Sequence, residues 1–292
     1  MIGYILAFVS SLFFAIYIVP RKLTKINPVH FSFFMSLGFL ASSLLLYFMQ
    51  PFIKFQETIS LNLLWALVAG LIWSVSFVCY ISSIDVIGLS RSNQWKNLQG
   101  PIGAFLGLIV LREYSKTNPV FVILAGAAIF VSAVFLSKTT SDDNKSTVLK
   151  GISLGLLSGV GFGVVSLINK YLSVHVGVFS QQVVWSFGIA ISLLIYIFTK
   201  NNLWKNLLKV PKKDFLLGIL AGFLYTGASF FFLESYRFIP VSIGITILQL
   251  STLWIVGIGI FVFKEIDLKK YFGNVLLGVL FALVSMVLLF FT

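Results

Sequence analysis

The strongest candidate for a chemical site is a run of polar side chains that opens an apolar stretch near residues 90–111. Lys96 lies about two helical turns inside that stretch, about 10 Å from its end. A charge at such depth in an apolar environment is costly unless it faces a cavity or a partner. We therefore expect this run to bind a polar solute through Ser92, Asn93, Trp95, Lys96, Asn97 and Gln99.

These side chains offer hydrogen bonds, charge and an aromatic face to a solute. Lys96 could donate to hydroxyls or to a carboxylate, or act as a proton-linked switch; it could equally snorkel to a membrane surface or form a structural ion pair. Trp95 could stack on a sugar, on a cation or on an aromatic solute, or it could be an interfacial anchor. On one continuous helix Ser92, Lys96 and Gln99 would share a face, and we predict that this face lines a cavity.

A second polar run, near residues 242–263, offers a matching wall. Thr246 and Gln249 share a helix face with Ser242. These side chains are uncharged, which suits hydroxyl-rich or zwitterionic solutes. Because Ser and Thr hydroxyls can also bond back to their own helix, Gln249 is the stronger candidate of the three.

Lys96, Glu234 and Arg237 are the candidates for coupling or gating. Glu234 and Arg237 are three residues apart and can pair on one helix face. Glu234 could instead carry a proton or pair with Lys96. No metal-ligand cluster, phosphate loop or nucleophile triad is visible in the sequence. We therefore predict that the protein is not an enzyme and that it has no catalytic residue, metal or cofactor. Without a Walker motif, the driving force would be protons, another ion or the gradient of the solute itself.

The composition requires a membrane around these residues. Of the 292 residues 59% are hydrophobic and 10% are charged, against about 25% charged in soluble domains. The net charge of +12 does not indicate nucleic acid, because the Lys and Arg lie between apolar runs and form no basic face. Runs of the length that spans a bilayer fall near 2–20, 30–50, 61–84, 90–111, 119–137, 151–168, 178–198, 215–236, 242–263 and 271–291.

The first five runs align with the last five. At an offset of 148 residues a row of small residues in the first run matches a row of glycines in the sixth: Gly3, Ala7, Ser11 and Ala15 against Gly151, Gly155, Gly159 and Gly163. At an offset of 152, Asn97 matches Gln249. Small residues spaced by four lie on one helix face and allow close packing. Gly100, Pro101 and Gly103 are expected to loosen or bend the fourth helix.

An odd number of helices per repeat reverses the direction of the second repeat, so the repeats are inverted. We expect an all-α membrane protein with ten transmembrane helices in two inverted five-helix repeats, at residues 1–138 and 151–292, joined by a loop at 139–150. The substrate site should lie near the bilayer midplane, between the repeats. Lys and Arg are in excess in the loops after odd-numbered helices, which predicts a multi-pass protein of the cell membrane with both termini outside.

The stretch from Val241 to Thr252, running on to Phe263-Lys264-Glu265, resembles helix 9 of the bacterial glucose/ribose and rhamnose uptake branch of the drug/metabolite transporter superfamily, whose members are ten-helix, EamA-like carriers. The matching stretch of the first half departs from that pattern by inserting Lys and Trp. The resemblance implies that helices 1–4 and 6–9 line a central cavity while helices 5 and 10 are peripheral.

The sequence thus predicts a secondary transporter that moves a small polar solute by alternating access, and a sugar is the solute that we expect. An exporter of amino acids, metabolites or cationic drugs is the first alternative, and a membrane enzyme or lipid-handling protein is an alternative of another class. The expected partners are a small-molecule substrate, the lipid bilayer, and protons or another coupling ion. Nucleic acid is not expected, and a homodimer is left open.

Overall fold

The computed structural model describes residues 1–53, 57, 59–110, 118–138, 145–235, 238–239 and 247–291. Within these ranges all regular secondary structure is helical. Eight described helices are long and apolar enough to cross a membrane: Ile2–Lys22, Pro28–Met49, Leu61–Ile87, Pro119–Leu136, Ser146–Ser173, Val178–Thr199, Lys212–Ser235 and Leu268–Leu288. They correspond to eight of the ten predicted runs, so the protein is an all-α, multi-span membrane protein.

The other two predicted runs contain shorter helices. The run at 90–111 holds α5 (Leu89–Lys96) and α6 (Gln99–Val110), and the described part of the run at 242–263 holds α13 (Leu250–Gly257) and a π-helix, η4 (Ile258–Val262). The loop predicted at 139–150 is shorter than expected, because α8 begins at Lys145. Polar residues between 145 and 150 do not prevent helix formation, so α8 begins before its apolar part.

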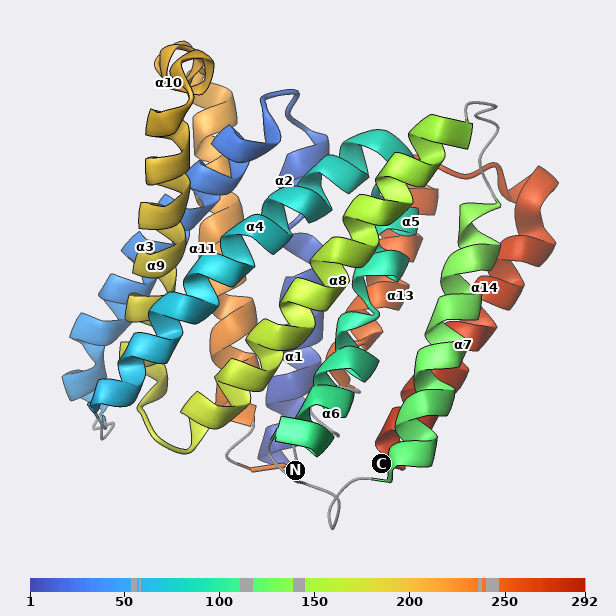
Figure 1. Cartoon of the computed structure of the whole chain (residues 1–292), viewed down its shortest axis with the longest axis horizontal. Helices are drawn as coiled ribbons and strands as arrows, with labels where there is room; N and C mark the ends of the chain where they lie inside the picture. Colours follow the sequence, from blue (N-terminus) through green and yellow to red (C-terminus); the bar gives the residue numbers. More distant parts are fainter. Residues whose placement is uncertain are drawn as a thin grey trace. The chain divides into compact units, whose positions relative to one another are not determined.

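The chain forms two compact units, and each draws on both halves of the sequence. The first comprises Met1–Val78 and Ile168–Phe238. It contains the starting part of α4 (Leu64–Ile87), the end of α8 (Lys145–Ser173), and these whole elements: α1 (Ile2–Ile16), α2 (Val19–Lys22), α3 (Pro28–Met49), η1 (Gln50–Ile53), η2 (Leu61–Leu63), α9 (Val178–Thr199), α10 (Asn201–Leu207) and α11 (Lys212–Ser235). Within this unit α11 packs against α1 and α3, and α3 also packs against α9 (Figure 1).

Small residues set the close packing of the first unit. The predicted small face of α1 is its buried face, and Ser10 Oγ donates to the carbonyl of Ala228 in α11 at 2.7 Å. Where α3 passes α11, a Cβ added to Gly38 or to Gly222 would overlap the backbone of the facing helix. A larger residue at either glycine would therefore push the two helices apart.

The second unit comprises Cys79–Leu167 and Ile239–Thr292. It holds the end of α4, most of α8, and α5, α6, α7 (Pro119–Ser137), α13, η4 and α14 (Leu268–Phe290). The pair α7–α14 is joined by two buried hydroxyls: Ser132 Oγ lies 2.6 Å from the carbonyl oxygen of Gly278, and Ser285 Oγ donates to that of Ala125 at 2.9 Å.

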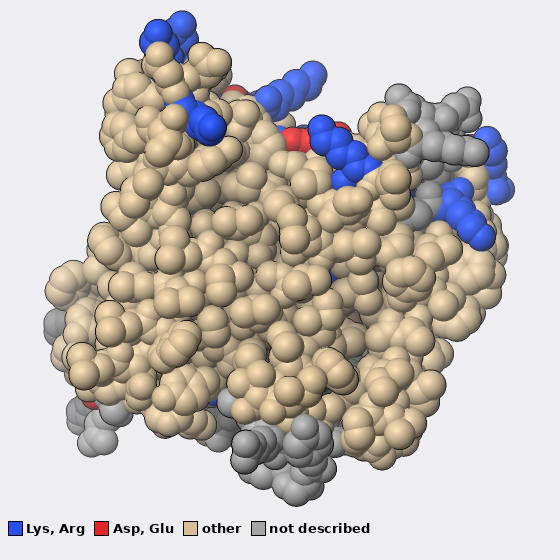
Figure 2. Space-filling view, in the orientation of Figure 1, with Lys and Arg blue, Asp and Glu red and all other residues tan. Residues whose placement is uncertain are grey.

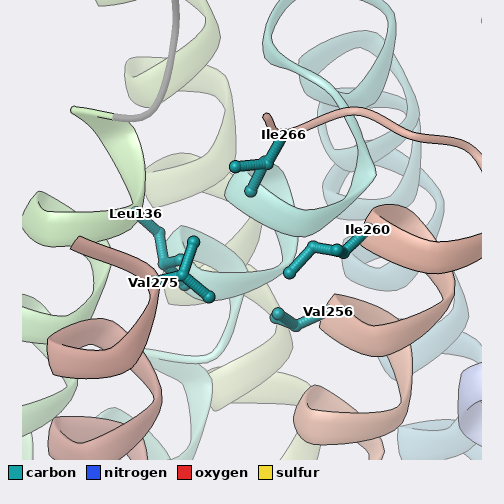
Figure 3. Packing of buried hydrophobic residues seen from close by; sticks show 5 residues of the cluster. All are labelled: Leu136, Val256, Ile260, Ile266 and Val275. Carbon is teal, nitrogen blue, oxygen red and sulfur yellow. The ribbon is translucent and has the colours of Figure 1, made fainter. Parts of the chain in front are cut away.

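An apolar cluster anchors the last turns of α13 and η4 to this helix pair. Its side chains come from α7, α13, η4, α14 and the segment before α14, and they point toward one another (Figure 3): Leu136, Val256, Ile260, Ile266 and Val275. All five are buried. The polar residues of α13, Ser251 and Thr252, lie at the opposite end of the helix, at its start.

The outer surface matches a lipid environment. On α14 the exposed apolar residues follow helical spacing: Phe272, Leu276, Leu280, Leu283 and Val287. On the face shown in Figure 2, described Lys and Arg side chains gather mainly at one end of the helices, and the middle of that face is almost wholly uncharged. A band of apolar side chains with charge at its edge is the pattern of a protein that spans a bilayer.

Candidate functional site

The predicted fourth helix is broken beside its polar run. α5 ends at Lys96, Asn97 is its C-cap, and α6 begins at Gln99. Pro101 explains the break, because proline lacks an N–H and its ring clashes with the carbonyl four residues earlier, that of Asn97. The Asn97 carbonyl instead accepts a hydrogen bond from the Gly100 N–H at 3.1 Å. The bend expected at Gly100–Pro101 is therefore present, and the single continuous face predicted for Ser92, Lys96 and Gln99 is interrupted.

A second break lies at Gln249, the residue that the offset of 152 aligns with Asn97. Residues 247–248 are helical, Gln249 is a turn residue, and α13 starts at Leu250. The Gln249 carbonyl accepts from the Thr252 N–H at 2.9 Å, which is the same three-residue bond as at Asn97. The residue matching Pro101 is Leu253, so no proline causes this break.

The two breaks touch each other inside the second unit. Asn97 Nδ2 donates a hydrogen bond to Thr252 Oγ1, and both side chains are buried. Gln249 is 5% exposed, and neither its amide nitrogen nor its amide oxygen has a partner among the described residues. The repeat explains this, because the residue matching Thr252 is Gly100, which has no side chain to offer.

Lys96 and Asn93 add hydrogen-bond donors beside the first break. The Lys96 ammonium lies 5.3 Å from the centre of the Tyr80 ring. The Tyr80 hydroxyl donates to Asn93 Oδ1 at 3.2 Å, while Asn93 Nδ2 is buried without a partner in the described part of the chain. We call the six residues Tyr80, Asn93, Lys96, Asn97, Gln249 and Thr252 the break cluster. Its unused groups can bind a polar solute.

Packing against α8 holds the broken helix in place. The glycines of α8 spaced by four residues, from Gly151 to Gly163, face α4, α5 and α6. A Cβ on Gly159 would lie 3.0 Å from the carbonyl oxygens of both Trp95 and Lys96. Ser83 Oγ lies 2.9 Å from Ser92 Oγ and 2.7 Å from the carbonyl oxygen of Gly151. Ser92 therefore has a partner within the protein, and the Ser83 hydroxyl links α4, α5 and α8.

Trp95 and Gln99, the other predicted residues of this run, differ in their surroundings. Trp95 is buried in an apolar cluster with Ile87 and Ala133, and its ring meets that of Phe130 edge-on at 5.5 Å. A ring packed in this way presents no open face to a solute. Gln99 is half-buried at the start of α6.

A carboxylate from a distant loop caps α5, which sequence reasoning missed. Glu265 accepts hydrogen bonds from the Leu89 N–H at 2.9 Å and from the Ser90 N–H at 3.1 Å. The preceding Gly88 has a φ of 84°, a conformation that favours glycine. The available signal was that α5 begins after a glycine with no local capping side chain. In the first unit Glu57 caps α9 in the same way, through the N–H groups of Phe179 and Ser180.

The first unit holds a separate aromatic cluster around Tyr225. The ring centres of Phe39, Trp73 and Trp185 lie 4.9, 5.2 and 6.0 Å from that of Tyr225. Nearby in sequence to Trp185, Gln182 donates to Ser229 Oγ at 2.8 Å, and its amide oxygen has no partner among described residues. Trp185 was missed, although it follows Gln182 by nearly one helical turn.

The remaining predicted residues are described only in part. Glu234 is buried near the end of α11, in the first unit. Thr246 and Arg237 lie outside the described residues. The predicted pairing of Glu234 with Arg237 or Lys96 therefore stays a prediction.

The first unit also has an apolar groove of about 500 Å³ between α3, the start of α4 and α9. Its lining is nearly all aliphatic or aromatic, and includes Leu40, Leu44, Leu67, Val184 and Phe187. Such a lining offers almost no hydrogen bonds to a hydroxyl-rich solute. The groove is thus a poor site for a polar substrate, and the break cluster is a better one.

The chain has a multi-span helical fold, and its polar residues gather where helices are interrupted. These features are typical of membrane transporters, because interrupted helices expose backbone and side-chain groups to a solute within the bilayer. Residues 52–292 match the family described as "Sugar transport protein". The chain belongs to that family.

Individual relatives agree with the family. The chain is 23% identical over 87% of its length to the glucose uptake protein GlcU of Bacillus subtilis (strain 168), covering 86% of that protein. It is 24% identical over 76% of its length to the probable glucose uptake protein GlcU of Priestia megaterium, covering 77% of it. A crystal structure of another protein aligns with 98% of this chain and 95% of its own, with a TM-score of 0.65 and 11% identity, which shows a shared fold.

Proposed function

We propose that this chain is a secondary transporter that carries a sugar across the cell membrane by alternating access. We propose for it the ten-helix plan of EamA-like drug/metabolite transporters, in two inverted five-helix repeats. Membership of the sugar transport protein family and the glucose uptake relatives support the substrate class. Eight described spans, with shorter helices in the two other apolar runs, support the ten-helix plan.

The observation that carries the proposal is the pair of helix breaks. Asn97 and Gln249 are 152 residues apart, which is the offset that aligns the second part of the two sequence repeats. Each carbonyl accepts from the N–H three residues later. A backbone feature that recurs at the repeat offset supports a duplicated architecture, and breaks at matching positions of two repeats are where transporters of this design bind their substrate.

Within this proposal the break cluster binds the solute. Gln249, Asn93 and Lys96 have polar groups available, whereas Asn97 and Ser92 are engaged within the protein and would position the others. Gln99, at the start of α6, would extend the site. Thr246, which lies outside the described residues, would be a further binding residue. Glu234 and Arg237 would serve in coupling or gating, together with Lys96. Trp95 would support the site from behind through its packing with α7 and α8.

We propose that both termini face outside. In the first unit, α2 and α10 lie at one end of their helices and the N-terminus at the other (Figure 1). Both α2 and the region around α10 are rich in Lys and Arg. Because basic loops remain in the cytoplasm, the end that carries them would be cytoplasmic.

Counterflow in proteoliposomes tests the function. Vesicles that contain the purified full chain and are loaded with unlabelled D-glucose should accumulate external radiolabelled D-glucose, and protein-free vesicles should not. Parallel loading with an amino acid and with an organic cation tests the exporter alternatives. Accumulation of either of these solutes, with none of any sugar, would contradict sugar transport.

A further inference from the structure

Lys96 is a buried cation, and no carboxylate in the described part of the second unit forms an ion pair with it. Its side chain is 7% exposed. Among the described residues, the contact of its ammonium group is the ring of Tyr80, at 5.3 Å. A tyrosine face offsets only part of the cost of removing an ammonium ion from water. An anionic group on a bound solute would offset the remainder.

The backbone beside Lys96 adds little positive charge to the site. Lys96 is the last residue of α5 and lies at the negative end of that helix dipole, while α6 starts three residues later, at Gln99. The N–H groups of Gly100 in α6 and of Thr252 in α13 already donate to backbone carbonyls. The capacity to bind an anion therefore comes from side chains.

The unpaired side-chain groups divide into two kinds. Lys96 Nζ and Asn93 Nδ2 are donors only, and they suit an acceptor such as a carboxylate. Gln249 has an unpaired donor and an unpaired acceptor, and it suits hydroxyls, which both donate and accept. A molecule that presents a carboxylate at one end and hydroxyls along its length satisfies both kinds.

The number of buried positive charges in the second unit indicates how many negative charges a bound solute should carry. Of the Lys and Arg side chains in the described ranges, Arg21 and Lys96 are buried. Arg21 belongs to the first unit and donates to the carbonyl of Ile26 at 2.7 Å. The described part of the second unit therefore supplies one buried positive charge, which matches one carboxylate better than a phosphate monoester with nearly two negative charges.

We infer that the substrate is a sugar acid, a monosaccharide with one carboxylate, whose carboxylate binds Lys96 and Asn93 near the end of α5 while Gln249 binds its hydroxyls. This inference rests on the proposed transport function and narrows its substrate class. The second repeat has Leu248 where the first has Lys96, so the charge belongs to one side of the site only.

Competition in proteoliposomes tests the inference on the unmodified protein. Counterflow is measured with radiolabelled D-glucuronate, D-gluconate, D-glucose and D-glucose 6-phosphate. One of the two acids should exchange fastest, and it should compete with labelled glucose about tenfold better than unlabelled glucose does. Glucose exchange without exchange of either acid would overturn the inference and leave sugar transport standing. Preference for the phosphate ester would overturn the carboxylate assignment, and exchange of none of the four would overturn both proposals.

Substitution of Lys96 tests the residue. Lys96→Gln should lower the ratio of acid counterflow to glucose counterflow about tenfold or more, because the amide can bond to hydroxyls but carries no charge for a carboxylate. Lys96→Arg keeps the charge and should keep the preference for acids. Ser285→Ala, which removes one buried hydrogen bond between α7 and α14, is the control. The same ratio in Lys96→Gln as in the unmodified protein would overturn the role of Lys96. If Lys96→Gln does not fold, Lys96→Arg and the competition experiment decide.

Discussion

The two helix breaks of the second unit have the same backbone hydrogen-bond pattern and differ in the partners of their side chains. At Asn97 the amide reaches across to Thr252, whereas the matching amide of Gln249 finds no described partner because Gly100 stands where Thr252 would be. One break is thus closed by the protein and the other keeps its hydrogen-bonding capacity. The difference teaches that two similar backbone breaks can leave different polar groups unpaired; in the proposed duplication, one copy would provide a rigid framework and the other a binding group.

The strongest test of this comparison exchanges the two amides for alanine. Gln249→Ala should reduce sugar or sugar-acid counterflow about a hundredfold, equal to ~2.7 kcal/mol, with little change in the free energy of unfolding, because no described hydrogen bond is lost. Asn97→Ala should lower the free energy of unfolding by about 1–2 kcal/mol, since Thr252 loses its buried partner. Unfolding in mixed detergent micelles and counterflow on the same preparations measure both. Equal effects of the two variants on both quantities would remove the distinction between the breaks.

A smaller effect is expected from the helix that supports the first break. Gly159→Ala should lower the free energy of unfolding by about 2 kcal/mol, because its new Cβ would lie 3.0 Å from two backbone carbonyl oxygens. Gly257→Ala is the matched control, since a Cβ there meets no atom within 4 Å. It should leave stability unchanged or slightly higher. A Gly159→Ala protein as stable as the control would mean that α8 does not fix the break.

The smallest effect is expected from the cap that precedes the first break. Glu265→Gln removes the negative charge that accepts from Leu89 and Ser90, and it should lower the free energy of unfolding by about 1 kcal/mol. It should also slow counterflow several-fold, because the eight-residue α5 carries Lys96 at its other end. Glu57→Gln is the control: it removes an equivalent cap from the 22-residue α9 in the other unit. A larger loss of counterflow in the control would show that the capped end of α5 does not support the site.

Several features of the fold follow directly from the sequence. Ten apolar runs were predicted, and eight are described as whole spans, because a segment in lipid must satisfy its backbone internally and its length is fixed by the bilayer. A bend in the fourth helix was predicted from Gly100, Pro101 and Gly103, and the break after Asn97 follows because proline acts on the carbonyl four residues before it. The predicted close packing along the α8 glycines was also found, because an absent side chain has the same consequence wherever the helix packs.

Other features depend on neighbours that are distant in sequence. The break at Gln249 has no local cause, and the Glu265 cap joins residues more than 170 positions apart. Trp95 was expected to stack on a solute or sit at an interface, and it is instead covered by α7 and α8. Trp185 was missed because an aromatic residue in an apolar run carries no sign of its partners.

The sequence by itself determined which segments are long and apolar enough to cross a membrane, and which of them carry unusual polar residues. Only the tertiary structure decided which of those polar groups remain unpaired, and so which of them can bind a solute. The physical reason is that hydropathy and helix breaking act within a few residues, whereas the pairing of a buried amide or ammonium depends on whichever helix packs against it.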